Sequence, residues 1–277
     1  MSRAVKSVSF CAPVNVMAMA VVSVTDDFST LDSERDGEVL RIWFDRPQKL
    51  NAVDTVLLRE VGDLFRNLER ETEARVIVLG GRGRSFCVGA DRNAEPDPDP
   101  PTSARERRWF NHLGRRACRA IEDCEIPTVA RVQGHAIGGG MCFAMSCDFR
   151  LTTPETLWYL PEVELGVPLT WAAIPRLTQE IGMARSRQLV MLAERIDGRK
   201  AADWALAHEC VELAELDDAV AAWTDRIVAL PEVAVHMTKT TFRGYNRLFS
   251  LGDASEADAD MLKLAETDPS VAANFGR

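Results

Sequence analysis

The pattern of apolar and polar positions predicts four strands within the first 152 residues. Residues 39–44 alternate in character, as a strand with one buried face does, and the turn-forming Arg46-Pro47 pair ends them. Residues 76–79 form a short continuous apolar run, which is typical of a strand covered on both faces. Residues 128–132 and 149–152 predict two further strands. Short buried strands of this kind are typical of α/β folds.

Helical periods separate these strands and then continue toward the C-terminus. Asp54 can cap a helix in which apolar side chains recur every three or four residues from Leu57 to Leu68. Further helices are predicted at about 104–123 and at 140–147, and from residue 172 onward the pattern is almost entirely helical. Alternating strands and helices followed by helices predict an α/β core of crossover units with a helical C-terminal region.

Length and composition predict one main domain with an appended helical region. A chain of 277 residues, 46% of them hydrophobic, can bury one substantial core, which we place at residues 37–230, with a helical region at 231–277. We expect residues 1–36 to be an N-terminal extension, disordered in part, because polar residues interrupt the apolar stretch that a targeting signal would need. Residues 93–103 hold four prolines and three acids, so they predict a mobile surface loop.

Charge and cysteine content argue against several classes of protein. The net charge of −9 argues against a nucleic-acid partner, because surfaces that bind nucleic acid are usually basic. Seven cysteines, an odd number with no C-x-x-C pair, fit reduced and mostly buried thiols in a cytoplasm. Four histidines without ligand spacing predict no metal site. No apolar stretch approaches the roughly 20 residues that span a bilayer, so no membrane partner is expected.

Two glycine-containing stretches, residues 81–91 and 134–141, each follow a predicted strand. Neither has the glycine spacing of a dinucleotide or phosphate loop. The second stretch stands at the expected N-terminus of a helix, where free amides and the positive end of the helix dipole favour a developing anion. Two such amides directed at one carbonyl oxygen form an oxyanion hole. Taken singly, each stretch is equally well explained as a tight turn.

Taken together with three further motifs, these stretches give the chain a specific resemblance. From about Glu38 to the C-terminus, the sequence resembles the enoyl-CoA hydratase/isomerase (crotonase) superfamily. The motifs that carry the resemblance are residues 46–52 (Arg-Pro-Gln-Lys-Leu-Asn-Ala), 85–91 (Ser-Phe-Cys-Val-Gly-Ala-Asp), 134–140, 147–148 (Cys-Asp) and 161–166 (Pro-Glu-Val-Glu-Leu-Gly). The resemblance implies a crotonase-like spiral of βαβ turns, with a helical C-terminal region that packs the subunits into trimers or hexamers.

The resemblance also implies a site for an acyl-CoA thioester. The amides of Ala90 and Gly139 would be its oxyanion donors, and Glu162 its base. Coenzyme A would enter only as part of the substrate, with no other cofactor, and would run along the first motif and the Gly-Ala-Asp loop. The residues expected to bind the acyl-CoA are Lys49, Leu50, Ala52, Val88, Gly89, Asp91, Arg92, Gly138, Cys142 and Trp171. The cations nearest these motifs, which could meet the phosphates, are Lys49, Arg82, Arg84 and Arg92.

The sequence departs from the hydratase pattern at two positions. Hydratases that the chain resembles position a water with two glutamates, of which this chain has Glu162 but carries Cys142 in place of the other. A thiol cannot replace that carboxylate, because its unperturbed pKa is about 8.5 and an apolar helix raises it further. Trp171 stands where many hydratases have small residues, so we expect it to reshape or shorten the acyl pocket, unless it is ordinary core.

One carboxylate is sufficient to move a double bond along an acyl chain. A single base takes a proton from C2 and returns it at C4 while the oxyanion hole holds the dienolate. Burial among Trp158, Leu160 and Val163 is expected to raise the pKa of Glu162 toward the working range of a base. Glu164 could face the same way if its segment is extended, although a surface or subunit-contact charge is its more ordinary role. Asp91 and Asp148 are expected to be structural.

The expected function is therefore that of an enoyl-CoA hydratase/isomerase family enzyme, a lyase or isomerase of fatty-acid metabolism. It would isomerise a double bond or hydrate one in an atypical way. Two alternatives stay open: a non-catalytic acyl-CoA binder, and a thioester hydrolase or decarboxylase on the same fold. We expect a cytoplasmic protein that self-associates as a trimer or hexamer.

Overall fold

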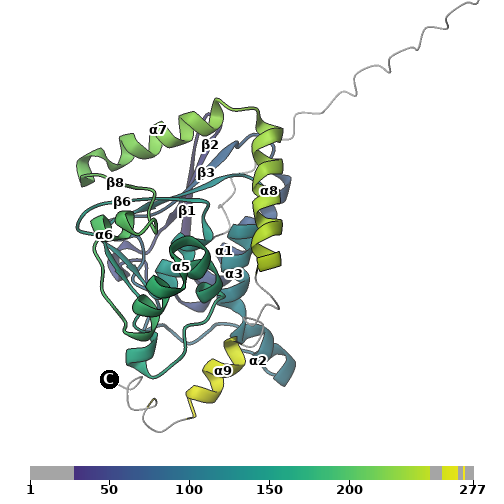
Figure 1. Ribbon diagram of the computed structural model, residues 1–277. Coiled ribbons are helices and arrows are strands. Elements are labelled where there is room, and N and C mark those ends of the chain that lie inside the picture. The colour runs from purple at the N-terminus through teal and green to yellow at the C-terminus, as the bar shows by residue number, and fades with distance from the viewer. Residues whose placement is uncertain (1–27, 250–257, 268–270, 272–277) are drawn as a thin grey trace, which may run out of the picture.

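A six-stranded sheet with the strand order β1-β2-β3-β4-β6-β8 lies at the centre of the protein (Figure 1). The computed structural model describes residues 28–249, 258–267 and 271. β1 pairs antiparallel with β2, and every later neighbour in this sheet is parallel. A second, two-stranded parallel sheet joins β5 to β7. The strands are β1 (Leu31–Asp36), β2 (Val39–Phe44), β3 (Val76–Gly81), β4 (Thr128–Val132), β5 (His135–Ile137), β6 (Phe149–Thr152), β7 (Leu157–Tyr159) and β8 (Glu209–Cys210).

Helices connect the strands, and the first of them begins at its predicted cap. The Asp54 carboxylate accepts a hydrogen bond from the Leu57 amide at 2.9 Å, which satisfies one of the free amides at the start of α1. The helical elements are η1 (Pro47–Lys49), α1 (Thr55–Asn67), η2 (Leu68–Arg70), α2 (Ala104–Asn111), α3 (Leu113–Asp123), α4 (Gly139–Ser146), η3 (Glu162–Leu165), α5 (Ala173–Met191), α6 (Gly198–Asp203), η4 (Leu213–Glu215), α7 (Leu216–Val228), α8 (Glu232–Phe249) and α9 (Asp258–Ala265).

The sheet is covered on both faces, and β3 shows how its sequence achieves this. Ile77 and Leu79 face the larger core, which α1 and α3 complete, whereas Val76 and Val78 face a smaller core under α7. Figure 1 shows α7 across one side of the sheet, with α1 and α3 on the other. Successive side chains of a strand point to opposite faces, so a strand buried on both faces is apolar throughout. The continuous apolar run at 76–79 is explained in this way.

The structure differs from the sequence-based expectation in several elements. β1 lies within the segment 1–36, for which the sequence predicts an extension, and six of its residues pair with β2, so the sheet starts at Leu31 and not after residue 36. The single helix expected at 104–123 is two helices, α2 and α3, separated by His112 with φ −93° and ψ 5°. β5 and β7 are not predicted, because three residues are too few to establish a period. Residues 1–27 of the expected extension lie outside the described residues.

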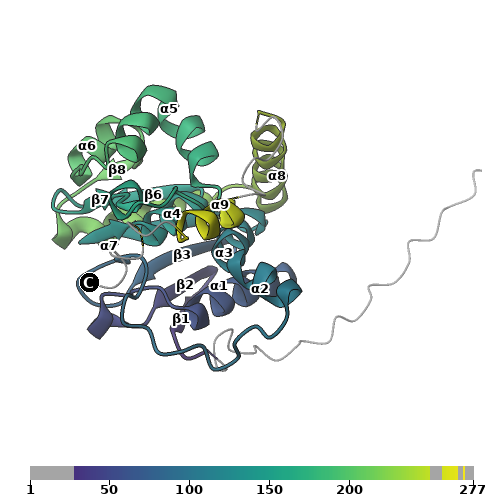
Figure 2. The same cartoon turned by 90° about the horizontal axis from the view of Figure 1, so that it is seen from below.

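The helical C-terminal region is present as predicted. α8 lies along one side of the molecule (Figure 2), and α9 packs against α2. Large apolar side chains of α8 are exposed, among them Val233, Met237, Phe242 and Tyr245. Among the described residues, no helix combines the length and the apolar character that crossing a bilayer requires.

Candidate active site

The first predicted amide donor, Ala90, lies in the loop that follows β3. The Val53 amide donates to the Gly89 carbonyl at 2.7 Å, and the Asp91 amide donates to the Val53 carbonyl at 2.8 Å, which makes an isolated parallel bridge between Val53 and Ala90. The residue between two such bonds directs its own N–H and C=O away from the neighbouring strand. The amide of Ala90 therefore points away from Val53, and it has no hydrogen-bond partner among the residues that the structure describes.

The second predicted donor, Gly139, is the first residue of α4. Gly138 before it has a φ of 51°, a conformation that glycine adopts without steric cost, and its amide donates to the Tyr159 carbonyl at 2.9 Å. The Gly139 amide has no partner within the described part of the chain, and it stands at the positive end of the helix dipole. A Cβ on Gly89 would lie 3.6 Å from the Gly139 nitrogen, so the two donor loops meet at this point.

Glu162 directs its carboxyl group at the same glycines. A Cβ added to Gly138 would lie 3.0 Å from Oε1 of Glu162, so the carboxyl group would have to move by a few tenths of an ångström to admit it. The other oxygen, Oε2, is buried and has no hydrogen-bond partner among the described residues. Burial raises the pKa of Glu162 to about 7. A pKa near the operating pH suits a group that first takes a proton and then gives it back.

The three apolar residues expected to bury Glu162 differ in their own burial. Trp158 and Leu160 are fully buried, but Val163 is 39% exposed. The segment is a 3-10 turn and not an extended strand, so successive side chains do not alternate between two faces. Glu164 accordingly faces away from Glu162: its carboxylate accepts from the Tyr159 hydroxyl and pairs with Arg195 at 3.2 Å.

Cys142 occupies the place of the second hydratase carboxylate and cannot act as one. Its side chain is 2% exposed on the first turn of α4. Burial raises the pKa of the thiol well above its ordinary value, and the neighbouring Cys118 and Glu162 add to the shift. Near neutral pH the Cys142 side chain is therefore an uncharged, weakly polar wall of the site.

These groups surround one cavity of about 370 Å³, which we call the Glu162 cavity. Of the predicted site residues, the structure brings to its lining Val88, Gly89, Ala90, Arg92, Gly138, Gly139, Cys142, Glu162 and Trp171. The predicted binding residues outside that lining are Lys49, Leu50, Ala52 and Asp91. The carboxylate of Asp91 pairs with Arg46 at 3.0 Å and with Lys49 at 2.9 Å, so it anchors the donor loop in the structural role expected of it.

The predicted phosphate-binding cations are divided among different places. Arg92 lines the Glu162 cavity. Arg82 instead pairs with Asp32 at 2.5 Å and with Glu34, and its guanidinium lies over the ring of Trp43. Because β1 supplies both acids, a sequence interpretation that leaves β1 out of the fold cannot anticipate this pairing.

Sequence reasoning did not anticipate that the C-terminal region contributes Leu262 and Glu266 to the cavity wall. Both come from the C-terminal region, from α9 and the turn after it, about a hundred residues beyond Glu162. Val271, further along, is buried and lies against Gly166 at the end of η3. The helical pattern of α9 predicts a packed helix, but no local signal indicates the cavity that it closes.

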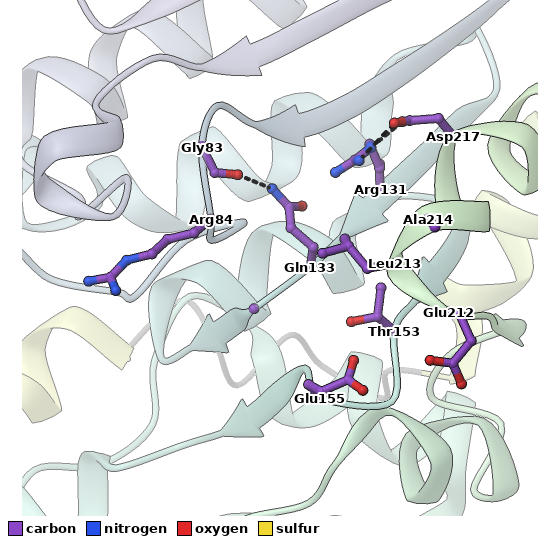
Figure 3. Close-up of a pocket in the computed structure, with 11 residues that line it drawn as sticks. Gly83, Arg84, Arg131, Gln133, Thr153, Glu155, Glu212, Leu213, Ala214 and Asp217 are labelled. Atoms are coloured by element: carbon purple, nitrogen blue, oxygen red, sulfur yellow. Dashed lines mark hydrogen bonds and ion pairs between the residues drawn. The ribbon is translucent and has the colours of Figure 1, made fainter.

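A larger hollow of about 760 Å³ lies at the carboxyl ends of β3, β4 and β6 (Figure 3). Two polar interactions connect residues of its lining: Arg131 and Asp217 form a two-point ion pair at 2.6 and 3.1 Å, and the Gln133 amide donates to the Gly83 carbonyl at 3.1 Å. Apart from Arg84, it includes none of the residues that the sequence predicts for binding or catalysis. The smaller cavity, which unites both free amides with Glu162, is therefore the candidate active site.

Comparison with known proteins assigns the chain to a family. Residues 34–271 match the family model described as enoyl-CoA hydratase/isomerase. The short-chain-enoyl-CoA hydratase of Clostridium acetobutylicum is 32% identical over 207 residues, which are 74% of this chain and 78% of that protein. The peroxisomal Delta(3,5)-Delta(2,4)-dienoyl-CoA isomerase of Arabidopsis thaliana is 28% identical, over 77% of this chain and 81% of that protein.

Solved structures agree with this assignment. A Thermobifida fusca protein, assigned as an enoyl-CoA hydratase and solved in complex with CoA, superposes with a TM-score of 0.73 at 29% identity, over 86% of this chain and 93% of that one. The fold class predicted from the sequence is thus confirmed, and the relatives are lyases and isomerases. The chain belongs to the enoyl-CoA hydratase/isomerase family.

Proposed function

We propose that the protein isomerises a double bond in an acyl-CoA, with Glu162 as its single base. One observation carries the proposal: a buried carboxyl group with a pKa of about 7 shares one cavity with two backbone amides that have no hydrogen-bond partner among the described residues. The position of the second hydratase carboxylate holds the neutral thiol of Cys142. This arrangement supports proton transfer between two carbons more directly than activation of a water by two carboxylates.

The proposed reaction follows from the placement of these groups. The thioester oxygen accepts hydrogen bonds from the amides of Ala90 and Gly139, while Glu162 removes a proton from C2. The electrons of the broken C–H bond move onto the thioester oxygen, and the dienolate is stabilised by roughly 3 kcal/mol for each amide donor. Glu162 then returns the proton at C4, which leaves the double bond between C2 and C3. A positioned base contributes typically 10²- to 10⁴-fold in rate.

Acyl-CoA recognition and assembly belong to the same proposal. The names of the curated relatives, which act on CoA thioesters, and the CoA complex of the Thermobifida fusca protein support a CoA substrate. Arg92, at the rim of the Glu162 cavity, is the side chain best placed to meet a phosphate. The exposed apolar residues of α8 support self-association as a trimer or hexamer, and reduced thiols support a cytoplasmic location.

A second candidate function, hydration, has one specific observation in its favour. Glu266 lines the same cavity as Glu162, so the C-terminal region can supply a second carboxylate in place of the one missing from α4. Lys263 pairs with Glu266 at 2.7 Å. In this case a water would lie between Glu162 and Glu266.

An assay with paired substrates tests the proposal. Purified protein is incubated with a 3-enoyl-CoA and, separately, with the 2-enoyl-CoA of the same length, and the products are identified by mass spectrometry. We expect the 3-enoyl-CoA to become the 2-enoyl-CoA, and Glu162→Gln to abolish this turnover. Addition of water to the 2-enoyl-CoA that Glu266→Gln also abolishes would favour hydration. Release of free CoA or of carbon dioxide would identify a hydrolase or decarboxylase, and binding without turnover would identify a non-catalytic binder.

A further inference from the structure

Two consecutive residues beside the Glu162 cavity adopt a backbone conformation that favours glycine. Trp171 has a φ of 62° and Ala172 has a φ of 56°. A side chain in this left-handed region is strained, and such strain persists only where the surrounding structure fixes it, often at a functional site. The turn before α5 is therefore held in place by specific contacts.

Arg176 supplies these contacts from the first turn of α5. Its Nη1 donates to the Trp171 carbonyl at 2.7 Å and to the Ala172 carbonyl at 3.1 Å, so one guanidinium holds both strained residues. The same guanidinium forms a two-point ion pair with Glu122 of α3, at 3.1 and 2.7 Å. Arg176 is 8% exposed, so its charge is buried and Glu122 is its counterion.

The held turn places the indole of Trp171 in a slot between α3 and α4. A Cβ on Gly114 of α3 would lie 1.8 Å from the indole, and one on Gly139 of α4 would lie 2.5 Å from it. Both helices therefore need glycine at the point where they face the ring. Phe143 of α4 packs on the indole with ring centroids 5.7 Å apart. The ring fills the slot and forms a wall of the Glu162 cavity beside the oxyanion amide of Gly139.

We propose that Arg176 and Glu122 are positioning residues that hold Trp171 across the slot, and that this wall restricts the enzyme to short acyl chains. The inference rests on the proposed function, because it assumes that the acyl group occupies the Glu162 cavity. Without the indole, the cavity continues between α3 and α4, where Gly114 leaves room for further methylene groups. Selection by chain length is thus governed by an ion pair that does not line the cavity itself.

Binding of two saturated thioesters, which cannot be isomerised, tests the inference. Dissociation constants of butanoyl-CoA and decanoyl-CoA are measured by calorimetry for the wild type, Trp171→Ala, Arg176→Met and the double variant. Arg185→Met is the matched control, because Arg185 also lies on α5, donates to a tryptophan carbonyl, that of Trp204 at 3.0 Å, and is not part of the cavity. Glu122→Gln, which leaves Arg176 in place, is a milder second variant.

We expect the wild type to bind butanoyl-CoA more tightly than decanoyl-CoA. Trp171→Ala should shift the ratio of the two constants toward decanoyl-CoA by roughly tenfold or more, since each methylene in an apolar pocket changes binding by that order. Arg176→Met and Glu122→Gln should shift it in the same direction, and the double variant should resemble Trp171→Ala alone, because the pair acts through the indole. Arg185→Met should leave the ratio unchanged.

If Arg176→Met and Glu122→Gln weaken the binding of both thioesters equally, the inference is overturned, since the ion pair would then only support the fold. An unchanged ratio in Trp171→Ala would overturn it as well. A wild type that binds neither thioester would refute the proposed function itself, and the inference with it.

Discussion

Replacement of Glu162 by glutamine should alter the dependence of stability on pH as well as activity. Burial raises the pKa of Glu162 in the folded protein from 4.5 to about 7. As the pH rises, the unfolded chain therefore loses this proton before the folded protein does. The stability that the protonated group contributes is complete below about pH 4.5 and is lost progressively up to about pH 7. Glutamine has nearly the same shape and does not ionise in this range. The unfolding free energy of Glu162→Gln should therefore not show this loss as the pH rises.

The magnitude follows from the difference between the two pKa values. The two pKa values, about 7 and 4.5, differ by about 2.5, and each pH unit corresponds to about 1.4 kcal/mol, so the full loss is about 3.5 kcal/mol. Between about pH 5 and about pH 8 the wild type should lose about 2.5 kcal/mol of unfolding free energy relative to Glu162→Gln. The cost of burying an amide in place of a carboxyl group is the same at both pH values, so it cancels in this comparison.

Urea unfolding of both proteins at the two pH values, at one protein concentration, measures the difference. Glu164→Gln is the matched control, because that carboxylate is 46% exposed and hydrogen bonding to Tyr159 lowers its pKa. The effect of Glu164→Gln on the unfolding free energy should be nearly the same at both pH values. A carboxylate with a lowered pKa loses its stabilising charge only at more acid pH. A free-energy difference between Glu162→Gln and the wild type that does not change with pH would refute the idea that Glu162 is a buried carboxyl group with a raised pKa.

Three further predictions follow from the geometry of the site. The kcat/KM for the 3-enoyl-CoA should rise with pH through about 7 and then level off, because only ionised Glu162 is a base; a profile that is flat there would exclude this role. Gly138→Ala should lower kcat by about a hundredfold, since its φ of 51° and the 3.0 Å contact with Glu162 displace the base, whereas Gly244→Ala, which meets open space, should not. Asp91→Asn should lower the unfolding free energy, measured by urea unfolding, by about 2 kcal/mol, because it weakens the bonds to Arg46 and Lys49. Asp63→Asn, at an exposed ion pair, should lower it by less than about 0.5 kcal/mol. Equal losses in the two variants would contradict the anchoring role of Asp91.

The features that depend on local sequence were predictable. Gly138 and Gly139 begin a helix directly after a strand, so the free amides of that helix start are a local property of the chain. The cap at Asp54 and the apolar run at 76–79 are local for the same reason. The role of Glu162 was predictable only from local sequence together with the motifs of a known family.

The features that depend on tertiary contacts were not predictable. Glu122 and Arg176 are 54 residues apart, and their pairing exists only because α3 and α5 meet beside the cavity. Glu266 reaches the cavity through the fold of the C-terminal region. The exposure of Val163 depended on whether a short segment is extended or helical, and four residues hold too little pattern to decide this.

Loss of deuterium from C2 tests the central claim most directly. A 3-enoyl-CoA with deuterium in place of both C2 hydrogens is incubated with the wild type or with Glu162→Gln, and the deuterium at C2 is followed by NMR together with the migration of the double bond. Removal of a C2 deuteron by Glu162, with the enolate held by the amides of Ala90 and Gly139, predicts that one deuteron leaves C2 as the double bond migrates in the wild type, whether it is returned at C4 or lost to water. Both rates should fall by roughly a hundredfold or more in the variant. Loss of deuterium that continues unchanged in Glu162→Gln, or a wild type that binds the thioester and keeps both deuterons at C2, would contradict it.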